Sequence, residues 1–243
     1  MPPRRSTRFR APALPELAGL PGRAGLPGLA GGAGPAASPL EQLEPLDASE
    51  LGPGRHFDGA RIAQIDATGL DLSGTTFSEC DIASLIADET RLLGARFVDS
   101  RLSQITAPRL RAARTTWRNV ELSSSRVGAL EAFDAELAQV HIEGSKLGWV
   151  NFRAAQLRDV TFTGCRFDEL DLSGATLTRV AFEHCSAQTL VLDQTRAQDL
   201  DLRGLDFAEL QGLDGLRGAR VSEEQGYDLL GVFARHFGVT IGG

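Results

Sequence analysis

The chain has few of the residues that build disulfide or metal frameworks. It contains three cysteines among 243 residues, an odd number and too few for the disulfide network of a secreted protein. Its four histidines, His56, His141, His184 and His236, have no partners at a zinc-binding spacing. We therefore expect a protein of the reducing cytoplasm with no metal site and no cofactor.

Long apolar runs are also missing. No stretch approaches the roughly 20 apolar residues that span a bilayer, so we expect no membrane contact. The arginine-rich first residues are interrupted by prolines and glycines, which excludes the core of a signal peptide. Neither a phosphate-binding glycine loop nor a nucleophile–base pair is present, and we expect that the protein is not an enzyme.

Residues 1–50 differ in composition from the rest, because proline, glycine, alanine and leucine dominate them. Proline removes backbone donors, and glycine raises the entropy lost on ordering. The composition predicts a disordered tail over residues 1–50.

After the tail, an apolar residue recurs at every fifth position. The series runs without interruption from Phe57 to Phe207, over 31 positions. The residue before each apolar centre is polar at 28 of these places, and the residue two before it is commonly small or aliphatic. Neither a helix nor a simple strand has this period. The pattern indicates a solenoid in which each unit points two side chains inward and three outward.

A longer period of twenty residues lies within the short one. Phe57, Phe77, Phe97 and Trp117 form one such series, in which like residues follow like. Four five-residue units therefore make one turn, and successive turns stack about 4.8 Å apart. Cys165 and Cys185 are twenty residues apart, so we expect them to stack inside the rod as buried, inert thiols.

Units such as Cys80-Asp81-Ile82-Ala83-Ser84 and Ala135-Glu136-Leu137-Ala138-Gln139 carry a small residue, an acid, an aliphatic centre and two variable positions. This pattern resembles the consensus of the pentapeptide-repeat family. The resemblance implies an all-β fold, a right-handed quadrilateral β-helix, which we place at residues 51–221. Some bacterial members resemble duplex DNA in size and charge, bind DNA gyrase or topoisomerase IV, and protect it from quinolones.

The five-residue series shifts by one position after Phe207, and a capping box follows at Ser222-Glu223-Glu224-Gln225. The box predicts a helix up to Phe237, stopped at Gly238. Its apolar stripe consists of Leu229, Leu230, Phe233, Ala234 and Phe237. We interpret residues 222–243 as a capping helix and tail. The alternative is a homodimer contact through Tyr227 and Val232, which lie off the stripe, since C-terminal helices mediate dimerisation in several family members.

Charge is distributed unevenly along the repeats. Between Glu89 and Arg118, seven arginines face two acids, a net charge of +5. These arginines are Arg91, Arg96, Arg101, Arg109, Arg111, Arg114 and Arg118. From Glu121 to Glu209 the net charge is -7. The sequence predicts a rod with a basic band and an acidic C-terminal part. The net charge of -7 for the whole chain argues against direct nucleic-acid contact through the band.

Four large apolar residues, Ile86, Leu93, Phe133 and Trp149, occupy outward positions, where exposed aromatics often mark an interface. The alternative is that the N-terminal tail covers them. Candidate acidic contacts are Asp168, Glu169 and Asp171. The leading hypothesis is a non-enzymatic interaction module that presents a rod-shaped surface to a macromolecular partner, expected to be a protein. One alternative is a DNA-mimicking modulator of gyrase or topoisomerase IV. Another is direct nucleic-acid contact.

Overall fold

The computed structural model describes residues 44–240, and the predicted tail therefore lies largely outside the described residues. Its last residues are ordered, contrary to the prediction for residues 44–50. Asp47 caps a short 3-10 helix, Ala48–Glu50, and its side chain accepts a hydrogen bond from the Ser49 N–H. Leu46 and Leu51 pack against the core, so this segment lies over the N-terminal end of the rod.

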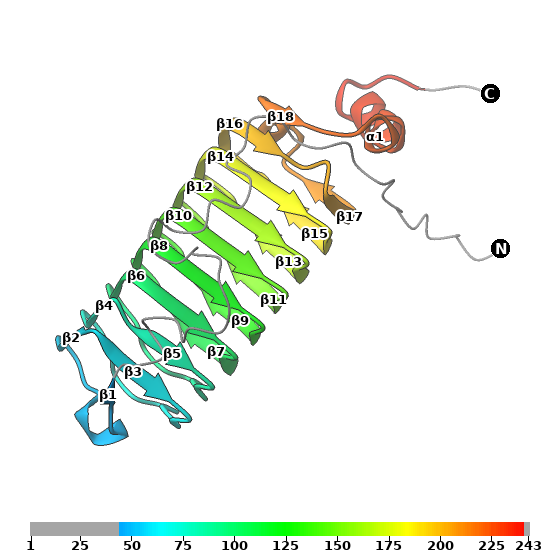
Figure 1. Ribbon diagram of the computed structural model, residues 1–243. Coiled ribbons are helices and arrows are strands. Elements are labelled where there is room, and N and C mark those ends of the chain that lie inside the picture. The colour runs from blue at the N-terminus through cyan, green and yellow to red at the C-terminus, as the bar shows by residue number, and fades with distance from the viewer. Residues whose placement is uncertain (1–43, 241–243) are drawn as a thin grey trace, which may run out of the picture.

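The described chain consists of parallel strands that wind around a rod, with one α-helix at its C-terminal end (Figure 1). The strands are β1 Glu44–Pro45, β2 His56–Asp58, β3 Ala60–Ala63, β4 Thr76–Ser78, β5 Asp81–Ala83, β6 Arg96–Ser103, β7 Thr106–Arg111, β8 Thr116–Ser123, β9 Arg126–Glu131, β10 Glu136–Glu143, β11 Lys146–Asn151, β12 Gln156–Thr163, β13 Arg166–Asp171, β14 Thr176–Glu183, β15 Cys185–Val191, β16 Arg196–Asp201, β17 Leu205–Gln211 and β18 Ala219–Arg220. A second 3-10 helix, Leu213–Leu216, precedes β18, and the α-helix is α1, Glu223–His236.

Residues twenty apart pair across neighbouring coils. Leu137, for example, lies opposite Trp117 on one side and Leu157 on the other. The rod has about eight turns. Its four faces are numbered here by the inward centres of the first coil, Phe57, Ile62, Ala67 and Leu72. The 12-stranded sheet forms the first two faces, and the 6-stranded sheet, β7 to β17, forms the third. The right-handed quadrilateral β-helix with a C-terminal helix is confirmed.

The corners of the rod use left-handed backbone two residues after an inward centre. In the described residues, 17 non-glycine side chains have a positive φ, all of them at this position, and Gly74 and Gly174 occupy it elsewhere. A left-handed residue turns the chain sharply while the flanking residues stay extended. Most corners therefore turn sharply at a fixed place in the five-residue unit, whereas the corner after the third face is extended from β7 to β15.

The interior is filled by stacked side chains. The rings of Phe57, Phe77, Phe97 and Trp117 lie 5.5, 5.1 and 4.7 Å apart along the rod. Packing is less complete in the N-terminal half, where a cavity of about 50 Å³ is lined by apolar side chains and Thr90. Inward alanines such as Ala87 stand at positions where later coils carry larger residues, which leaves this space unfilled.

The rod ends with a register change and a docked helix. Leu200 pairs with Ala219, a separation one residue shorter than between other coils, which confirms the shift after Phe207. The capping box at Ser222 and Gln225 is also confirmed. The predicted apolar stripe is only partly buried, however. Leu229 is buried, whereas Leu230 and Phe237 are exposed, because only the first turns of α1 rest on the last coil. No helix of the described residues is long and apolar enough to cross a membrane.

Candidate interaction surface

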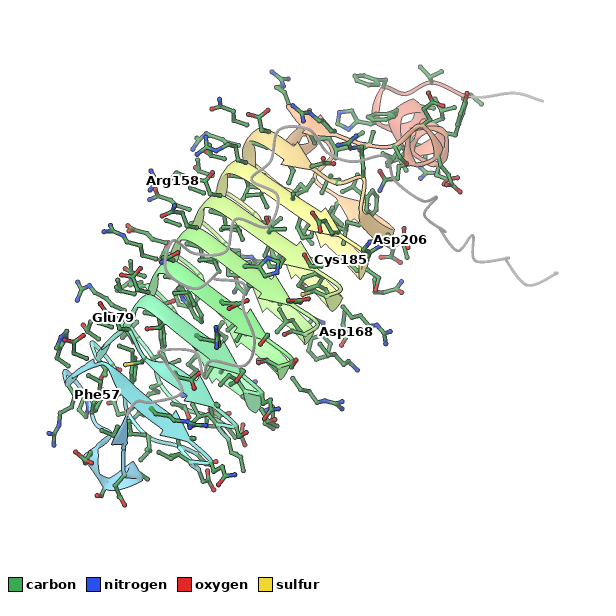
Figure 2. All side chains as sticks on the ribbon, in the orientation of Figure 1. Phe57, Glu79, Arg158, Asp168, Cys185 and Asp206 are labelled. Atoms are coloured by element: carbon green, nitrogen blue, oxygen red, sulfur yellow. The ribbon has the colours of Figure 1, made fainter. Side chains whose placement is uncertain are left out.

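The structure brings together three of the predicted interface residues on the third face. Trp149 on β11 lies opposite Ala129 on β9 and Glu169 on β13. Its side chain is 63% exposed. Asp168, next to Glu169, is exposed as well, and Figure 2 shows it among the side chains that project from the edge of the rod. Trp149, Asp168 and Glu169 thus form one surface, named here the tryptophan corner.

Backbone geometry explains why this tryptophan stands outward. At the corner after the third face, the early coils use left-handed residues, Gly69 and Glu89. Trp149 has no positive φ, and β11 continues through the same corner as an extended strand. Glycines permit the close approach of these strands, since a Cβ on Gly148 would lie 2.3 Å from the carbonyl oxygen of Gly128. Gly128 and Gly148 therefore add no side chains to the surface beside Trp149.

Two other predicted contacts lie at the opposite edge of the fourth face. Leu93 is half-exposed, and Phe133, two coils further along the same column, is partly buried. They border the fourth face from the side away from Trp149, so the predicted patch is split by one face of the rod.

Asp171 does not belong to the exposed acidic surface on which the sequence placed it. It is buried, and its Oδ1 accepts hydrogen bonds from the backbone N–H and hydroxyl of Ser173. Its Oδ2 forms an ion pair with the Arg153 Nε at 2.5 Å. A carboxylate that accepts hydrogen bonds two residues ahead stabilises a turn, so Asp171 has a structural role.

The two predicted dimer residues on α1 also differ from each other. Tyr227 is 73% exposed, whereas Val232 packs against the core of its own rod. Tyr227 is therefore the more accessible of the two residues, and the homodimer contact stays a prediction. Tyr227, Leu230 and Phe237 are the large exposed side chains of α1.

The predicted basic band is largely neutralised by acids one coil away. Arg91 pairs with Asp71, and Arg101 with Glu121. Further ion pairs join Arg109 to Glu89 and Glu131, Arg111 to Glu89, and Arg114 to Asp134. Of the seven arginines, only Arg96 and Arg118 make no ion pair in the described part of the chain. Most of the positive charge of the band is therefore paired with acidic side chains.

A stack of cations that the sequence reasoning missed lies on the third face instead. Arg126, Lys146 and Arg166 begin β9, β11 and β13 and lie directly opposite one another. All three are exposed, and none forms an ion pair with any described residue. We name them the cationic ladder. Every twentieth residue from Thr106 gives this series, but acids such as Glu131, Asp168 and Glu169 lie close to it along the chain, so a net charge count hides it.

The three cysteines lie in the interior of the rod, away from these surface charges. Cys80, Cys165 and Cys185 are buried free thiols, as expected. The Cys165 backbone N–H donates to the Cys185 Sγ at 3.3 Å, in the place where the Ser125 N–H donates to the Ser145 Oγ two coils earlier. Burial also raises the pKa of the Cys80 thiol. The Cys185 sulfur thus satisfies one backbone donor, and the thiols of Cys80, Cys165 and Cys185 donate to the backbone carbonyl oxygens of Phe57, Ile142 and Phe162.

The family description "Pentapeptide repeat region" matches residues 135–212. This match covers coils whose inward centres, register and corners follow the five-residue period described above. Residues 135–212 are thus a pentapeptide-repeat region. The repeats extend on both sides of the matched residues, since the same period begins at Phe57. Pentapeptide-repeat proteins are generally non-catalytic structural or interaction modules.

Two solved structures of other proteins are similar to this chain at low identity. A trypsin-treated variant of QnrB1, described as a plasmid-mediated fluoroquinolone resistance protein, is 19% identical with a TM-score of 0.33, over 81% of this chain and 94% of that chain. HetL from Nostoc sp. strain PCC 7120, described as involved in heterocyst differentiation regulation, is 17% identical with a TM-score of 0.24, over 70% and 90%. No curated protein matches the chain.

Proposed function

We propose that this pentapeptide-repeat protein is a non-enzymatic interaction module that binds a macromolecular partner, a protein, on the third face of its rod. The observation that carries the proposal is the exposure of Trp149. A tryptophan that is 63% exposed contributes little to the fold, and its corner is held extended by strands on both sides. Tryptophans on flat, rigid surfaces are frequent centres of binding energy in protein interfaces.

The surroundings of Trp149 support binding rather than catalysis. Gly128, Gly148 and Ala129 leave a flat floor, and Asp168 and Glu169 supply negative charge at one side. The cavity of about 50 Å³ in the N-terminal half is lined by apolar side chains and Thr90, which together form no catalytic group. A surface with an aromatic residue and both signs of charge fits a protein partner.

A photo-crosslinking amino acid at Trp149 tests the proposal in living cells. The control carries the same group at Arg158, which is exposed on another face (Figure 2). We expect a discrete protein adduct from position 149 and none from position 158. Equal adducts from both positions, or none from either, would contradict the proposal. Mass spectrometry of the adduct separates a foreign protein from a second copy of this chain.

A sharper form of the proposal names the partner that the family resemblance implies, DNA gyrase or topoisomerase IV. The acidic side chains of the tryptophan corner would then mimic part of the phosphate surface of DNA. The measurement is gyrase supercoiling with and without a quinolone, using the wild type and the variant D168K/E169K. We expect the wild type to inhibit supercoiling or to reduce drug-stabilised cleavage, and the variant to lose the effect. Asp171 is left unchanged, because it is buried. No effect at a large excess over the enzyme excludes this partner.

A further inference from the structure

The cationic ladder is an exception to the way this rod arranges charge. Many arginines of the rod pair with an acid of a neighbouring coil, as in the pairs Arg101–Glu121 and Arg179–Asp159. In the ladder, Arg126 and Arg166 flank Lys146 in register, with no acid within 4 Å among the described residues. Like charges directly opposite across strands are destabilising. A negative group from outside the chain would relieve this repulsion.

The neighbours of the ladder indicate which kind of anion it binds. Two residues after each ladder position, Gly128 and Gly148 lack side chains and Asp168 carries a carboxylate. Trp149 follows Gly148. A polyphosphate chain would be repelled by Asp168 and Glu169, whereas a protein segment can place carboxylates on the ladder and keep them away from these acids. The mixed signs therefore favour a protein segment over nucleic acid.

A segment with this chemistry is present in the chain itself. Glu224 and Asp228 on α1 are exposed and lie four residues apart, on the same side of the helix as the exposed Tyr227. The opposite side is fixed to the rod, because Gln225 and Leu229 are buried there. Gly231, which follows on the outward side, has nothing within 4 Å of an added Cβ, so α1 has a small residue for close approach.

We propose that α1 of a second copy lies across β9, β11 and β13, with Glu224 and Asp228 on the cationic ladder and Tyr227 against Trp149. Residues four apart on a helix are displaced by about 6 Å along its axis. Ladder positions on neighbouring strands are about 4.8 Å apart. Two carboxylates thus reach two successive steps of the ladder. This inference rests on the binding surface of the proposed function and identifies its occupant.

The occupant must be a second copy, because α1 cannot reach the ladder of its own rod. In the sheet order, β13, β15 and β17 separate β11 from the end of the rod, and α1 lies beyond β17 (Figure 1). Two copies that exchange this contact by a two-fold axis form a closed dimer in which the same two surfaces are used twice. This arrangement differs from a helix-to-helix dimer.

Charge reversal on both sides tests the contact. Sedimentation equilibrium of the full chain should give a dimer for the wild type. The variants R126E/K146E/R166E and E224K/D228K should each weaken it about tenfold or more. The combination of both sets should restore much of the affinity. R158E is the matched control and should leave the dimer unchanged. A monomeric wild type, or a dimer that none of the reversals weakens, overturns the inference.

Lys146 is the only lysine of the chain, which permits a second and more direct measurement. A carbodiimide joins amines to carboxylates in contact. In a mixture of isotope-labelled and unlabelled copies, we expect a peptide that joins Lys146 of one copy to Glu224 or Asp228 of the other. Cross-links confined to one copy would contradict the contact. Failure here leaves the proposed function open, since photo-crosslinking at Trp149 to a foreign protein does not depend on the dimer.

Discussion

The side-chain amide of Gln225 donates a hydrogen bond to the carbonyl oxygen of Leu202 at 2.9 Å. This bond joins the first turn of α1 to the last complete coil, and the same amide also donates to the Leu205 carbonyl at 2.9 Å. Both carbonyls belong to a coil end that has no following strand at this position. Gln225 thus satisfies buried backbone groups that the next coil would otherwise satisfy.

Gln225→Ala should therefore release α1 from the rod. The change removes the Gln225 donor from two carbonyl oxygens, of which that of Leu202 keeps the hydrogen bond from the Leu205 N–H, so the expected cost is about 1–3 kcal/mol. Denaturant unfolding gives the loss of stability, and hydrogen exchange shows whether α1 becomes unprotected. Glu223→Ala, at an exposed position of the same turn, is the control and should change little. Equal stabilities of the two variants would exclude this role of Gln225.

Ala87→Val should stabilise the rod. Ala87 lines the cavity, and a larger side chain there buries more apolar surface, with a gain of about 1 kcal/mol. The matched variant is Ala187→Val in the same column, which is buried but does not line this cavity, so that overpacking there costs about 1–3 kcal/mol. Thermal unfolding should shift upward for the first and downward for the second. A downward shift in both would show that the cavity does not accept the added methyl groups.

Gly148→Ala should destabilise the third face. The new Cβ would meet the Gly128 carbonyl oxygen at 2.3 Å, so the strands must separate, at a cost of about 1–3 kcal/mol. Gly226→Ala provides the contrast, because its Cβ meets nothing within 4 Å. In a helix, that change should add about 0.5–1 kcal/mol of stability. The free energies of unfolding in urea show whether Gly148→Ala lowers stability and Gly226→Ala raises it. If Gly148→Ala leaves the stability unchanged, the close approach of the two strands is refuted.

Asp206→Asn should stabilise the junction of rod and helix at neutral pH. Burial, and then the nearby carboxylate of Glu224, raise the pKa of Asp206 above 3.8. The folded state therefore holds this proton more tightly than the unfolded state, and stability falls as pH rises from 3.8 to the raised value. The gain from Asp206→Asn is about 0.5 kcal/mol or less after solvent screening.

Thermal unfolding of the wild type and Asp206→Asn across this range measures the effect. The difference should vanish below pH 3.8, where the carboxyl is protonated in both states. Glu224→Gln removes only the repulsion and should give a smaller gain. A difference that persists unchanged into acid would mean that the titration of Asp206 is not its cause. Figure 2 shows Asp206 on the coil next to α1.

The fold was predictable from sequence because every five-residue unit repeats the same pattern of buried and exposed side chains. An inward centre such as Leu137 and a polar residue before it determine which side chains are buried, and the period of twenty determines the register. The corner at Trp149 was not predictable in this way. The same corner turns through a left-handed residue at Gly69 and Glu89 but is extended from β7 to β15, although the five-residue pattern is the same in all these coils.

Surface charge was predicted less well, for a geometric reason. A count along the chain combines residues from four faces, while the nearest charged neighbour of a side chain is one coil away. Arg101 therefore belongs with Glu121, and Lys146 with Arg126 and Arg166. Columns of residues twenty apart recover both facts. The burial of Asp171 is not explained by its hydrogen bonds with Ser173, since Asp71 makes the same bonds with Ser73 and its side chain is 42% exposed. Asp171 differs in its close ion pair with Arg153.

The register of twenty residues also determines how this chain folds and opens. Each coil pairs only with the coils before and after it, so every step closes a loop of the same short length, however long the rod becomes. Growth can proceed in both directions from any formed pair of coils. The tightly filled coils around Phe162 would form the nucleus, and the N-terminal coils around the cavity would open first.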